Sequence, residues 1–165
     1  MGAIVYKEIT DEHLEEVAGI YNYFVENTTI TFHTECVSVQ EMRESVIHPN
    51  PRFKSFVVEQ DGAIAGYVLI AQHKKKQAYD TSGEVTIYLK PDCVGAGIGA
   101  KALQFIEDVA RQNGFHVLVV TICTENERSM RLFEKNGYRQ CAHFKEIGRK
   151  FGRWLDIATY QKILD

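Results

Sequence analysis

Residues 85–101 read VTIYLKPDCVGAGIGAK, and this stretch decides the fold of the chain. It has the order of a β-strand, a short loop, a glycine cluster and the beginning of a helix. Glycine lets a backbone approach a ligand closely, and the unpaired N–H groups and dipole at a helix N-terminus favour phosphate oxygens. The stretch therefore predicts a phosphate-binding turn. The competing interpretation is a glycine-rich helix start that binds nothing.

Two common nucleotide-binding motifs fit this stretch poorly. A Walker P-loop ends in Gly-Lys-Ser/Thr, whereas Gly99 is followed by Ala100, Lys101 and Ala102. A Rossmann dinucleotide site follows its strand almost directly and lies within repeated βαβ units. Here residues 90–94 intervene, and the sequence contains only one such unit. The pattern therefore disfavours both motifs.

Strand-like and helix-like segments alternate outward from this stretch, which is typical of an α/β domain. An Asp-Gly pair at residues 61–62 predicts a hairpin turn, because glycine tolerates positive φ. The nearly continuous apolar run at 117–120 predicts a central parallel strand buried on both faces. We expect strands at 3–8, 55–59, 63–70, 84–89, 116–123, 139–146 and 154–163, and helices at 11–27, from 38 to before Pro49, at 97–113 and at 126–136.

Local signals also predict where two of these helices begin or end. Ser38 and Glu41 have the spacing of a capping box, in which each side chain bonds the other residue's backbone amide. Gly137 follows the helix expected at 126–136, and a glycine there supplies a left-handed C-terminal cap.

Composition narrows the class of protein. A chain of 165 residues is expected to form a single domain, 1–165. The net charge of −3 gives no reason to expect a nucleic-acid or membrane-surface partner, because both favour basic proteins. No segment approaches the roughly 20 apolar residues of a membrane helix, and the N-terminal apolar run is too short for a signal peptide. We therefore expect a cytoplasmic protein.

The cysteines and histidines give no sign of a cross-linked or metal-bound framework. The four cysteines lack any C-x-x-C arrangement, and the six histidines are scattered along the chain. In a chain without a leader, such cysteines are expected to be reduced thiols. We expect no metal site, because no ligand spacing of the zinc-binding type is present.

The strand, loop and glycine cluster resemble the pyrophosphate-binding motif of the GCN5-related N-acetyltransferases, the GNAT family. The family pattern is Gln/Arg-x-x-Gly-x-Gly/Ala, and Gly97 and Gly99 match its glycines. Val94 stands where the pattern has Gln or Arg. Backbone amides do most of the phosphate binding, so this departure leaves the main interaction in place.

Other strings, spread in the same order over nearly the whole chain, resemble the phosphinothricin and methionine sulfoximine/sulfone acetyltransferases of that family. The resemblance implies direct transfer of an acetyl group from acetyl-coenzyme A to the α-amine of a small amino acid or an analogue. It also implies a homodimer. The strings are residues 20–22 (IYN), 31–35 (TFHTE), 78–80 (AYD), 124–132 (TENERSMRL) and 148–156 (GRKFGRWLD).

The resemblance implies a mixed, strongly twisted sheet of about seven strands with about four helices on its two faces. The fourth and fifth strands splay apart, and acetyl-coenzyme A lies in the gap. The implied contacts to the cofactor are backbone groups of Ile87, Tyr88 and Leu89 for the pantetheine arm and acetyl carbonyl, amides of Gly95, Ala96, Gly97, Ile98, Gly99 and Ala100 for the pyrophosphate, the Asn126 side chain for the pantetheine arm, and Lys135 at a further cofactor-side position.

Glu84 is the candidate catalytic residue. An amine must lose its proton before it can attack a thioester, and a carboxylate can accept that proton directly or through water. Glu84 begins the strand next to the expected acetyl group and matches the glutamate proposed as base in the related enzymes. The alternative is an ordinary glutamate at a strand end.

Candidate substrate contacts cluster in the loop before Glu84. Lys74 and Lys76 match basic positions near the substrate of the related enzymes, and a lysine ammonium can hold a carboxylate. The alternative is a solvated, charged loop. Tyr79 and Phe32 are candidate walls of the substrate pocket, although aromatic side chains more often pack in a core. Trp154 is expected to serve packing.

Phe133 departs from the related enzymes, many of which have a tyrosine or histidine there to protonate the leaving thiolate. Phenylalanine has no proton to give, so a dedicated general acid is in doubt. Two alternatives to a small-molecule acetyltransferase stay open. One keeps the fold and acetylates a protein or peptide amine, and the other is a non-enzymatic acyl-coenzyme A sensor.

Overall fold

The computed structural model describes residues 2–165 and contains one seven-stranded sheet with four α-helices. The strands are β1 (Ile4–Glu8), β2 (Ser55–Gln60), β3 (Ala63–Gln72), β4 (Ser82–Leu89), β5 (Val117–Cys123), β6 (Arg139–Lys150) and β7 (Arg153–Ile163). The helices are α1 (Leu14–Asn27), α2 (Val39–Val46), α3 (Ile98–Gln112) and α4 (Glu127–Lys135), with short 3-10 turns η1 (Asp11–His13), η2 (Gln77–Tyr79) and η3 (Pro91–Cys93).

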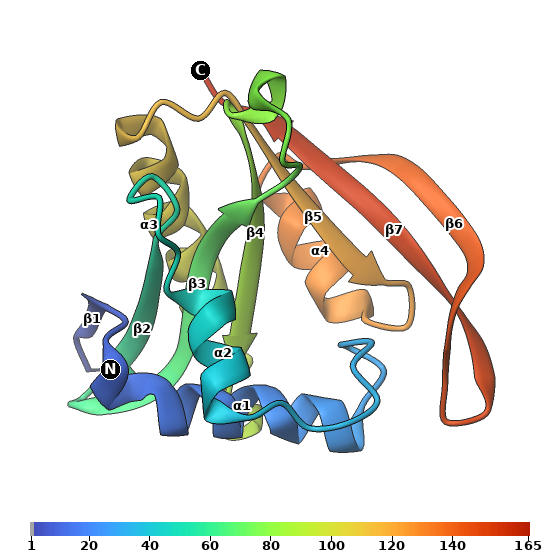
Figure 1. Ribbon diagram of the computed structural model, residues 1–165, viewed down its shortest axis with the longest axis horizontal. Helices are drawn as coiled ribbons and strands as arrows, with labels where there is room; N and C mark the ends of the chain where they lie inside the picture. The colour runs from blue at the N-terminus through green and yellow to red at the C-terminus, as the bar shows by residue number, and fades with distance from the viewer. Residues whose placement is uncertain (1) are drawn as a thin grey trace.

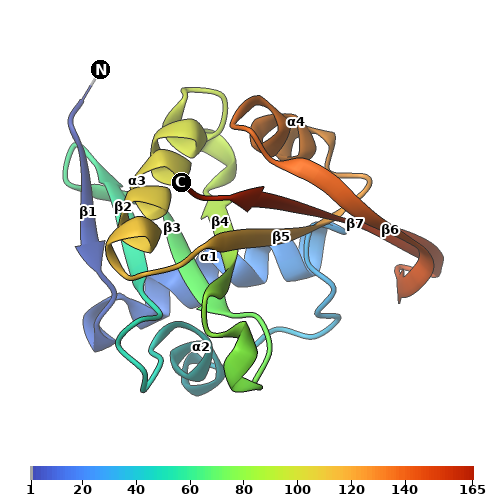
Figure 2. The same ribbon diagram turned by 90° about the horizontal axis from the view of Figure 1, so that it is seen from above.

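The sheet has the strand order β1-β2-β3-β4-β5-β7-β6 and is mixed, as predicted (Figure 1). Helices α3 and α4 lie on one face, and α1 and α2 lie on the other (Figure 2). The long strand β3 serves both cores, because successive side chains of a strand point to opposite faces. Val68 and Ile70 pack with α3, whereas Tyr67 and Leu69 pack with α1 and α2.

Strands β4 and β5 diverge, and this divergence creates the main opening in the fold. They pair in parallel over only three residues each, from Ser82 with Val117 to Glu84 with Val119. Beyond this last pair, which we call the vertex, β4 stays bonded to β3 and β5 stays bonded to β7. The two strands then form a V in Figure 1. The edge of β4 that faces β5 therefore has no strand partner from Val85 to Leu89.

Several element boundaries differ from those expected. Strand β4 begins at Ser82 and β6 extends to Lys150, because long-range pairing with β3 and β7 lengthens both strands. The first turn of the helix expected at 11–27 is the 3-10 turn η1. Strand β5 was expected to have parallel neighbours, but only β4 pairs with it in parallel. Its other neighbour, β7, is antiparallel along the whole strand.

The predicted turn and cap residues are confirmed. Asp61 and Gly62 have φ values of 54° and 80°, the left-handed conformation that a tight hairpin between β2 and β3 needs. The Ser38 side chain accepts a hydrogen bond from the Glu41 amide at 3.0 Å, and Glu41 accepts one from the Ser38 amide at 3.0 Å. Gly137 follows α4 with φ 91°. Within residues 2–165, no helix combines the length and apolar character that a membrane crossing requires.

Candidate active site

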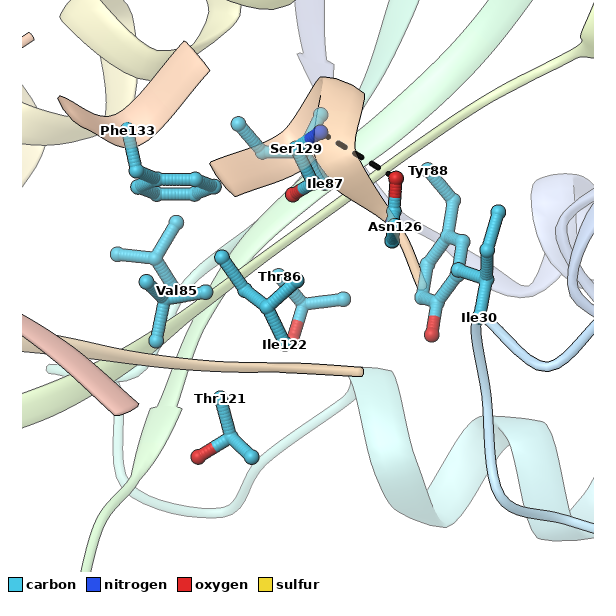
Figure 3. A pocket seen from close by; sticks show the side chains of 11 residues that line it. Ile30, Val85, Thr86, Ile87, Tyr88, Thr121, Ile122, Asn126, Ser129 and Phe133 are labelled. Atoms are coloured by element: carbon cyan, nitrogen blue, oxygen red, sulfur yellow. Dashed lines mark hydrogen bonds between the residues drawn. The ribbon is translucent and has the colours of Figure 1, made fainter. Parts of the chain in front are cut away.

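A cleft occupies the space between the diverging strands β4 and β5 (Figure 3). Its inner part measures about 70 Å³ and is lined by both strands and by the beginning of α4. Its outer part measures about 120 Å³ and runs past the end of β4 to Gly99 at the start of α3. Both parts share the residues Ile30, Ile87, Tyr88, Asn126, Ser129 and Phe133. The two parts therefore form one path from the glycine cluster toward the vertex.

The unpaired edge of β4 forms one wall of this path. Ile87, Tyr88 and Leu89 pair with β3 on one side, and all three line the cleft on the other. In an antiparallel ladder, alternate residues direct both backbone polar groups to the same side. Alternate residues of this segment therefore present free N–H and C=O groups to the cleft, as an extended amide-containing chain would require.

The glycine cluster has the conformation expected of an anion-binding turn. Gly95 and Gly97 have φ values of 87° and 78°, which side chains with a Cβ rarely adopt. Within residues 2–165, the backbone amides from 95 to 100 make no backbone hydrogen bond. The first helical bond runs from the Lys101 amide to the Gly97 carbonyl at 3.3 Å. Ala96, Ile98 and Ala100 thus lie in a segment whose amides are free for a ligand.

Gly99 has a different reason to be glycine. A Cβ at this position would lie 3.3 Å from Cδ2 of Leu132 on α4 and 3.8 Å from Cδ1 of Leu89 on β4. The absence of a side chain therefore lets α3, α4 and the end of β4 converge where the outer cleft opens. Val94, in place of the polar residue of the family pattern, lines the same opening and is exposed.

Asn126 lies in the cleft wall, whereas Lys135 does not. The Asn126 Oδ1 atom accepts a hydrogen bond from the Ser129 amide at 3.2 Å and caps α4 (Figure 3). Among the hydrogen bonds of residues 2–165, none involves the Asn126 Nδ2 atom, which remains able to donate. Lys135 ends α4, is exposed, and does not line either part of the cleft. Its role at a cofactor-side position stays a prediction.

Glu84 lies at the vertex itself, and its carboxylate binds a histidine that the sequence analysis did not single out. The Glu84 Oε2 atom lies 2.8 Å from Nδ1 of His73. The Glu84 side chain is 36% exposed, so the carboxylate is reachable from solvent. This contact results from the antiparallel pairing of β3 with β4. Its register, Ala71 with Glu84, cannot be read from local sequence.

The loop between β3 and β4 contains three of the predicted substrate residues and begins at His73, which binds Glu84. Lys74, Lys76 and Tyr79 are all exposed. Within residues 2–165, neither lysine forms a salt bridge with a carboxylate. The Tyr79 ring meets the His73 ring edge-on, with centroids 5.7 Å apart. The loop therefore offers two unpaired cations and an aromatic side chain beside the candidate base.

Phe32 adjoins residues that line the inner cleft, whereas Trp154 lines no part of the cleft. Phe32 packs against β6, since a Cβ on Gly148 would lie 2.4 Å from its Cε2 atom, and it shares a pocket of about 220 Å³ with Tyr88 and Thr121. The packing prediction for Trp154 is wrong. Its side chain is 59% exposed, with the Arg149 guanidinium 4.7 Å from the ring centroid. Trp154 is the second residue of β7, and no helix covers the end of the β6–β7 hairpin where β7 begins (Figure 1).

A second cavity of about 360 Å³ lies on the α1 and α2 side of the sheet. Glu84, Thr86 and Tyr88 alternate along β4 and therefore share this face. Thr86 lines both the cavity and the inner cleft, and it lies two residues, about 6–7 Å, along the strand from Glu84. The cavity wall is formed by Tyr21, His33, Val37, Met42, Ser45, Val46, Tyr67, Leu69, Ala71, Thr86 and Tyr88.

This cavity is mostly apolar and has a polar end. The Tyr21 hydroxyl hydrogen-bonds the Thr31 hydroxyl at 2.6 Å and the His33 ring. Burial raises the pKa of Tyr21 and that of Tyr88, so both hydroxyls keep their protons near neutral pH. In the sequence, Tyr21 and His33 belong to two of the strings that resemble the related acetyltransferases. Their convergence on one cavity comes from the fold.

Phe133 lies where the sequence predicted a departure from related enzymes. It is 2% exposed and lines both parts of the cleft (Figure 3). Its ring packs edge-on against Tyr138, with centroids 4.9 Å apart. Within residues 2–165, no group of three or more histidine, cysteine, aspartate or glutamate side chains could hold a metal ion.

Residues 7–158 match the model of the family described as Acetyltransferase (GNAT) domain. The chain is 34% identical to the phosphinothricin N-acetyltransferase of Streptomyces coelicolor, over 93% of this chain and 92% of the relative. It is 30% identical to the L-methionine sulfoximine/L-methionine sulfone acetyltransferase of Salmonella typhimurium, over 90% of this chain and 88% of the relative. These matches confirm the resemblance drawn from the sequence strings.

Solved structures confirm the fold. A phosphinothricin acetyltransferase from Sinorhizobium meliloti in complex with AcCoA superposes with a TM-score of 0.91 at 29% identity, over 98% of this chain and 88% of that one. A ribosomal-protein-alanine N-acetyltransferase from Brucella melitensis superposes with a TM-score of 0.88 at 30% identity, over 97% of this chain and 99% of that one.

Proposed function

The chain belongs to the GNAT family of acetyltransferases and uses acetyl-coenzyme A as its acetyl donor, and we propose that it acetylates the α-amine of a small amino acid or an amino-acid analogue. One observation carries the proposal. Glu84 ends the pairing of β4 with β5 at the vertex, the next residue Val85 lines the cleft, and the register partner of Glu84, Ala71, lines the apolar cavity. A donor and an acceptor would therefore meet at a carboxylate.

The cleft suits the donor. Amides from Gly95 to Ala100 would bind the pyrophosphate, because they are unpaired and lie at a helix N-terminus. The free edge of β4 from Ile87 to Leu89 would pair with the amides of the pantetheine arm much as a neighbouring strand would. The Asn126 Nδ2 atom would donate to the same arm from the opposite wall.

Glu84 would act as the general base. One oxygen of its carboxylate, Oε1, has no hydrogen-bond partner within residues 2–165 and is free to accept the proton of the acceptor ammonium. The neutral nitrogen then attacks the thioester carbonyl carbon and loses its second proton to water, and the carbon–sulfur bond breaks. No covalent enzyme intermediate is needed. General-base assistance of this kind is worth roughly 10²–10⁴ in rate.

The acceptor side suits an amino acid. Lys74 and Lys76 would hold its carboxylate, since both ammonium groups are exposed and unpaired in the described chain. The cavity of about 360 Å³ would take its side chain against apolar walls. The polar end, where Tyr21 meets His33, would bind a polar tip. Tyr79 would cover the loop side of the bound molecule.

The leaving thiolate would take its proton from water. Phe133 offers none, and a coenzyme A thiolate is a tolerable leaving group without a dedicated acid. The proposed enzyme therefore works without a dedicated general acid.

We also propose a cytoplasmic homodimer. All four cysteines are free thiols, and two of them, Cys36 and Cys141, are exposed, which suits a reducing compartment. The outer strand β6 has an uncovered edge, and an exposed edge beside apolar side chains favours association. Sedimentation should give twice the chain mass of 18.8 kDa, and a monomer would contradict the dimer. The exposed apolar side chains of the β6–β7 hairpin are Phe144, Ile147, Phe151, Trp154 and Ile163.

A second candidate is acetylation of a peptide N-terminus. It is favoured by the likeness to the Brucella melitensis ribosomal-protein-alanine N-acetyltransferase. The two candidates differ in what must fit beyond the α-carbon. A peptide replaces the carboxylate that Lys74 and Lys76 would hold with a neutral amide and a continuing chain.

The deciding experiment is a screen of acceptors with acetyl-coenzyme A, following thiol release and the mass of the product. The panel contains phosphinothricin, methionine sulfoximine, methionine sulfone, the common L-amino acids, their amides and alanine-initiated peptides. Turnover of free amino acids or analogues above their amides supports the proposal. Turnover of peptides alone supports the second candidate. Binding of acetyl-coenzyme A without turnover of any acceptor would support the sensor.

A further inference from the structure

The imidazole of His73 lies directly against the carboxylate of Glu84, with Nδ1 2.8 Å from Oε2. His73 is the first residue after β3, and Ala71, two residues earlier, is the register partner of Glu84. Side chains two residues apart on an extended chain share a face. The backbone pairing of β3 with β4 thus presents the histidine to the carboxylate.

The chemistry of the two groups fixes the direction of this hydrogen bond. An ionised carboxylate can only accept, so Nδ1 of His73 carries the hydrogen. The bond engages Oε2, whereas Oε1 has no hydrogen-bond partner within residues 2–165. The carboxylate is therefore fixed through Oε2, and Oε1 is left able to accept a hydrogen bond or a proton.

The His73 ring is itself held in place. Tyr79 packs edge-on against it from the 3-10 turn η2, and the His73 side chain is only 24% exposed. A glutamate side chain that must be ordered in every turnover loses rotamer entropy. A standing hydrogen bond lets that ordering occur during folding, and precise placement of a reacting group can be worth large factors in rate.

We propose that His73 is a positioning residue for Glu84. Its Nδ1–H group holds Oε2 so that Oε1 meets the acceptor ammonium, and the inference rests on the proposed role of Glu84 as base. In the step, the nitrogen–hydrogen bond of the ammonium breaks and an oxygen–hydrogen bond forms at Oε1. His73 keeps its Nδ1 proton throughout, and the proton on Glu84 passes to water afterwards.

Two substitutions separate this role from a general structural one. His73→Leu removes the hydrogen-bond donor but still places a side chain against the Tyr79 ring. His73→Asn keeps an N–H donor near the position of Nδ1 and cannot titrate. Each variant is assayed with the fastest acceptor from the panel above. The thermal shift produced by acetyl-coenzyme A checks that each variant folds, and His73→Ala replaces His73→Leu if the latter does not.

We expect kcat of His73→Leu to fall about 10- to 100-fold, the worth of a hydrogen bond to a charged group. The KM for acetyl-coenzyme A should stay within about twofold, since His73 does not line the cleft. His73→Asn should recover most of the loss. In a Glu84→Gln background, His73→Leu should cost less than about threefold, because the carboxylate to be positioned is gone.

Three results would overturn the inference while leaving Glu84 in its role. In the first, Glu84→Gln is slow but His73→Leu has the kcat of the wild type. In the second, His73→Asn loses as much kcat as His73→Leu does. In the third, His73→Leu lowers kcat by the same factor whether residue 84 is glutamate or glutamine. Wild-type turnover in Glu84→Gln would instead remove the base from the proposed function and the positioning role with it.

Discussion

At the scale of single residues, the proposed reaction depends on which side chains can accept or donate a proton. Phe133 is buried in the cleft wall, at the position where the resemblance implies a tyrosine or histidine in many related enzymes. Glu84 and His73 form a hydrogen-bonded pair at the vertex. Glu84 was predictable, because the strand that contains it was evident and the resemblance marked its position. His73 was not, because its contact depends on the register between β3 and β4.

Phe133→Tyr tests whether the missing acid limits the reaction. We expect kcat to change less than about tenfold, or 1.4 kcal/mol. The thiolate needs little help, and the site is packed around a phenyl ring whose neighbour is the edge-on ring of Tyr138. A steady-state assay at saturating acceptor measures this. A gain of a hundredfold or more would contradict the proposed mechanism and strengthen the sensor alternative.

Lys74→Ala combined with Lys76→Ala tests recognition of the acceptor carboxylate. We expect the acceptor KM to rise, because the two cations proposed to hold the carboxylate are lost, and the KM for acetyl-coenzyme A to stay unchanged. The control is the neighbouring Lys75→Ala variant. Comparison of an amino acid with its amide completes the test, since an equal loss for both would show that these lysines do not bind the carboxylate.

At the scale of elements, positions along the chain were more predictable than pairings across it. Hydrophobic periodicity and turn residues such as Asp61 and Gly62 are local, so the strands and helices could be anticipated. The three-residue pairing that ends at Glu84 and Val119 is long-range, and no local pattern encodes it. The splay was therefore expected from the resemblance alone. The exposed position of Trp154 likewise follows from a hairpin that extends past the covering helices.

Gly97→Val tests the anion-binding turn. Its φ of 78° and its place before α3 mean that a branched side chain would distort the turn and displace the free amides. We expect the thermal stabilisation by acetyl-coenzyme A to disappear. Gly152→Val is a matched control, since Gly152 has φ 72°, lies in the β6–β7 hairpin and likewise has open space at its Cβ. Loss of the stabilisation in both variants, or in neither, would contradict the assignment of the turn.

At the scale of the whole molecule, a cleft and a cavity that open on opposite sides of the sheet both lie against strand β4. The cleft opens on the side of α3 and α4, and the cavity opens on the side of α1 and α2. Thr86 and Tyr88 line both spaces because the unpaired edge of β4 separates them. Donor and acceptor would approach through different openings, as direct transfer requires.

Binding of the donor should stabilise the folded chain, since only the folded state forms the cleft. At 100 times its dissociation constant, acetyl-coenzyme A should add about 2.7 kcal/mol to the free energy of unfolding. NADH and ATP should add much less, because the cleft has an extended strand edge where those ligands would need a base-binding pocket. Thermal denaturation with each ligand measures this. Equal stabilisation by NADH would contradict the fit of the cleft to coenzyme A.

The most direct test of transfer at the vertex is the turnover of Glu84→Gln against wild type across a range of pH, with saturating acetyl-coenzyme A. Glutamine keeps the size of the side chain and removes its ability to accept a proton. We predict a kcat lower by roughly 10²–10⁴ near neutral pH, with unchanged affinity for acetyl-coenzyme A. The deficit should shrink as pH rises, because more of the acceptor amine is already neutral. Wild-type turnover of Glu84→Gln at neutral pH would contradict the account.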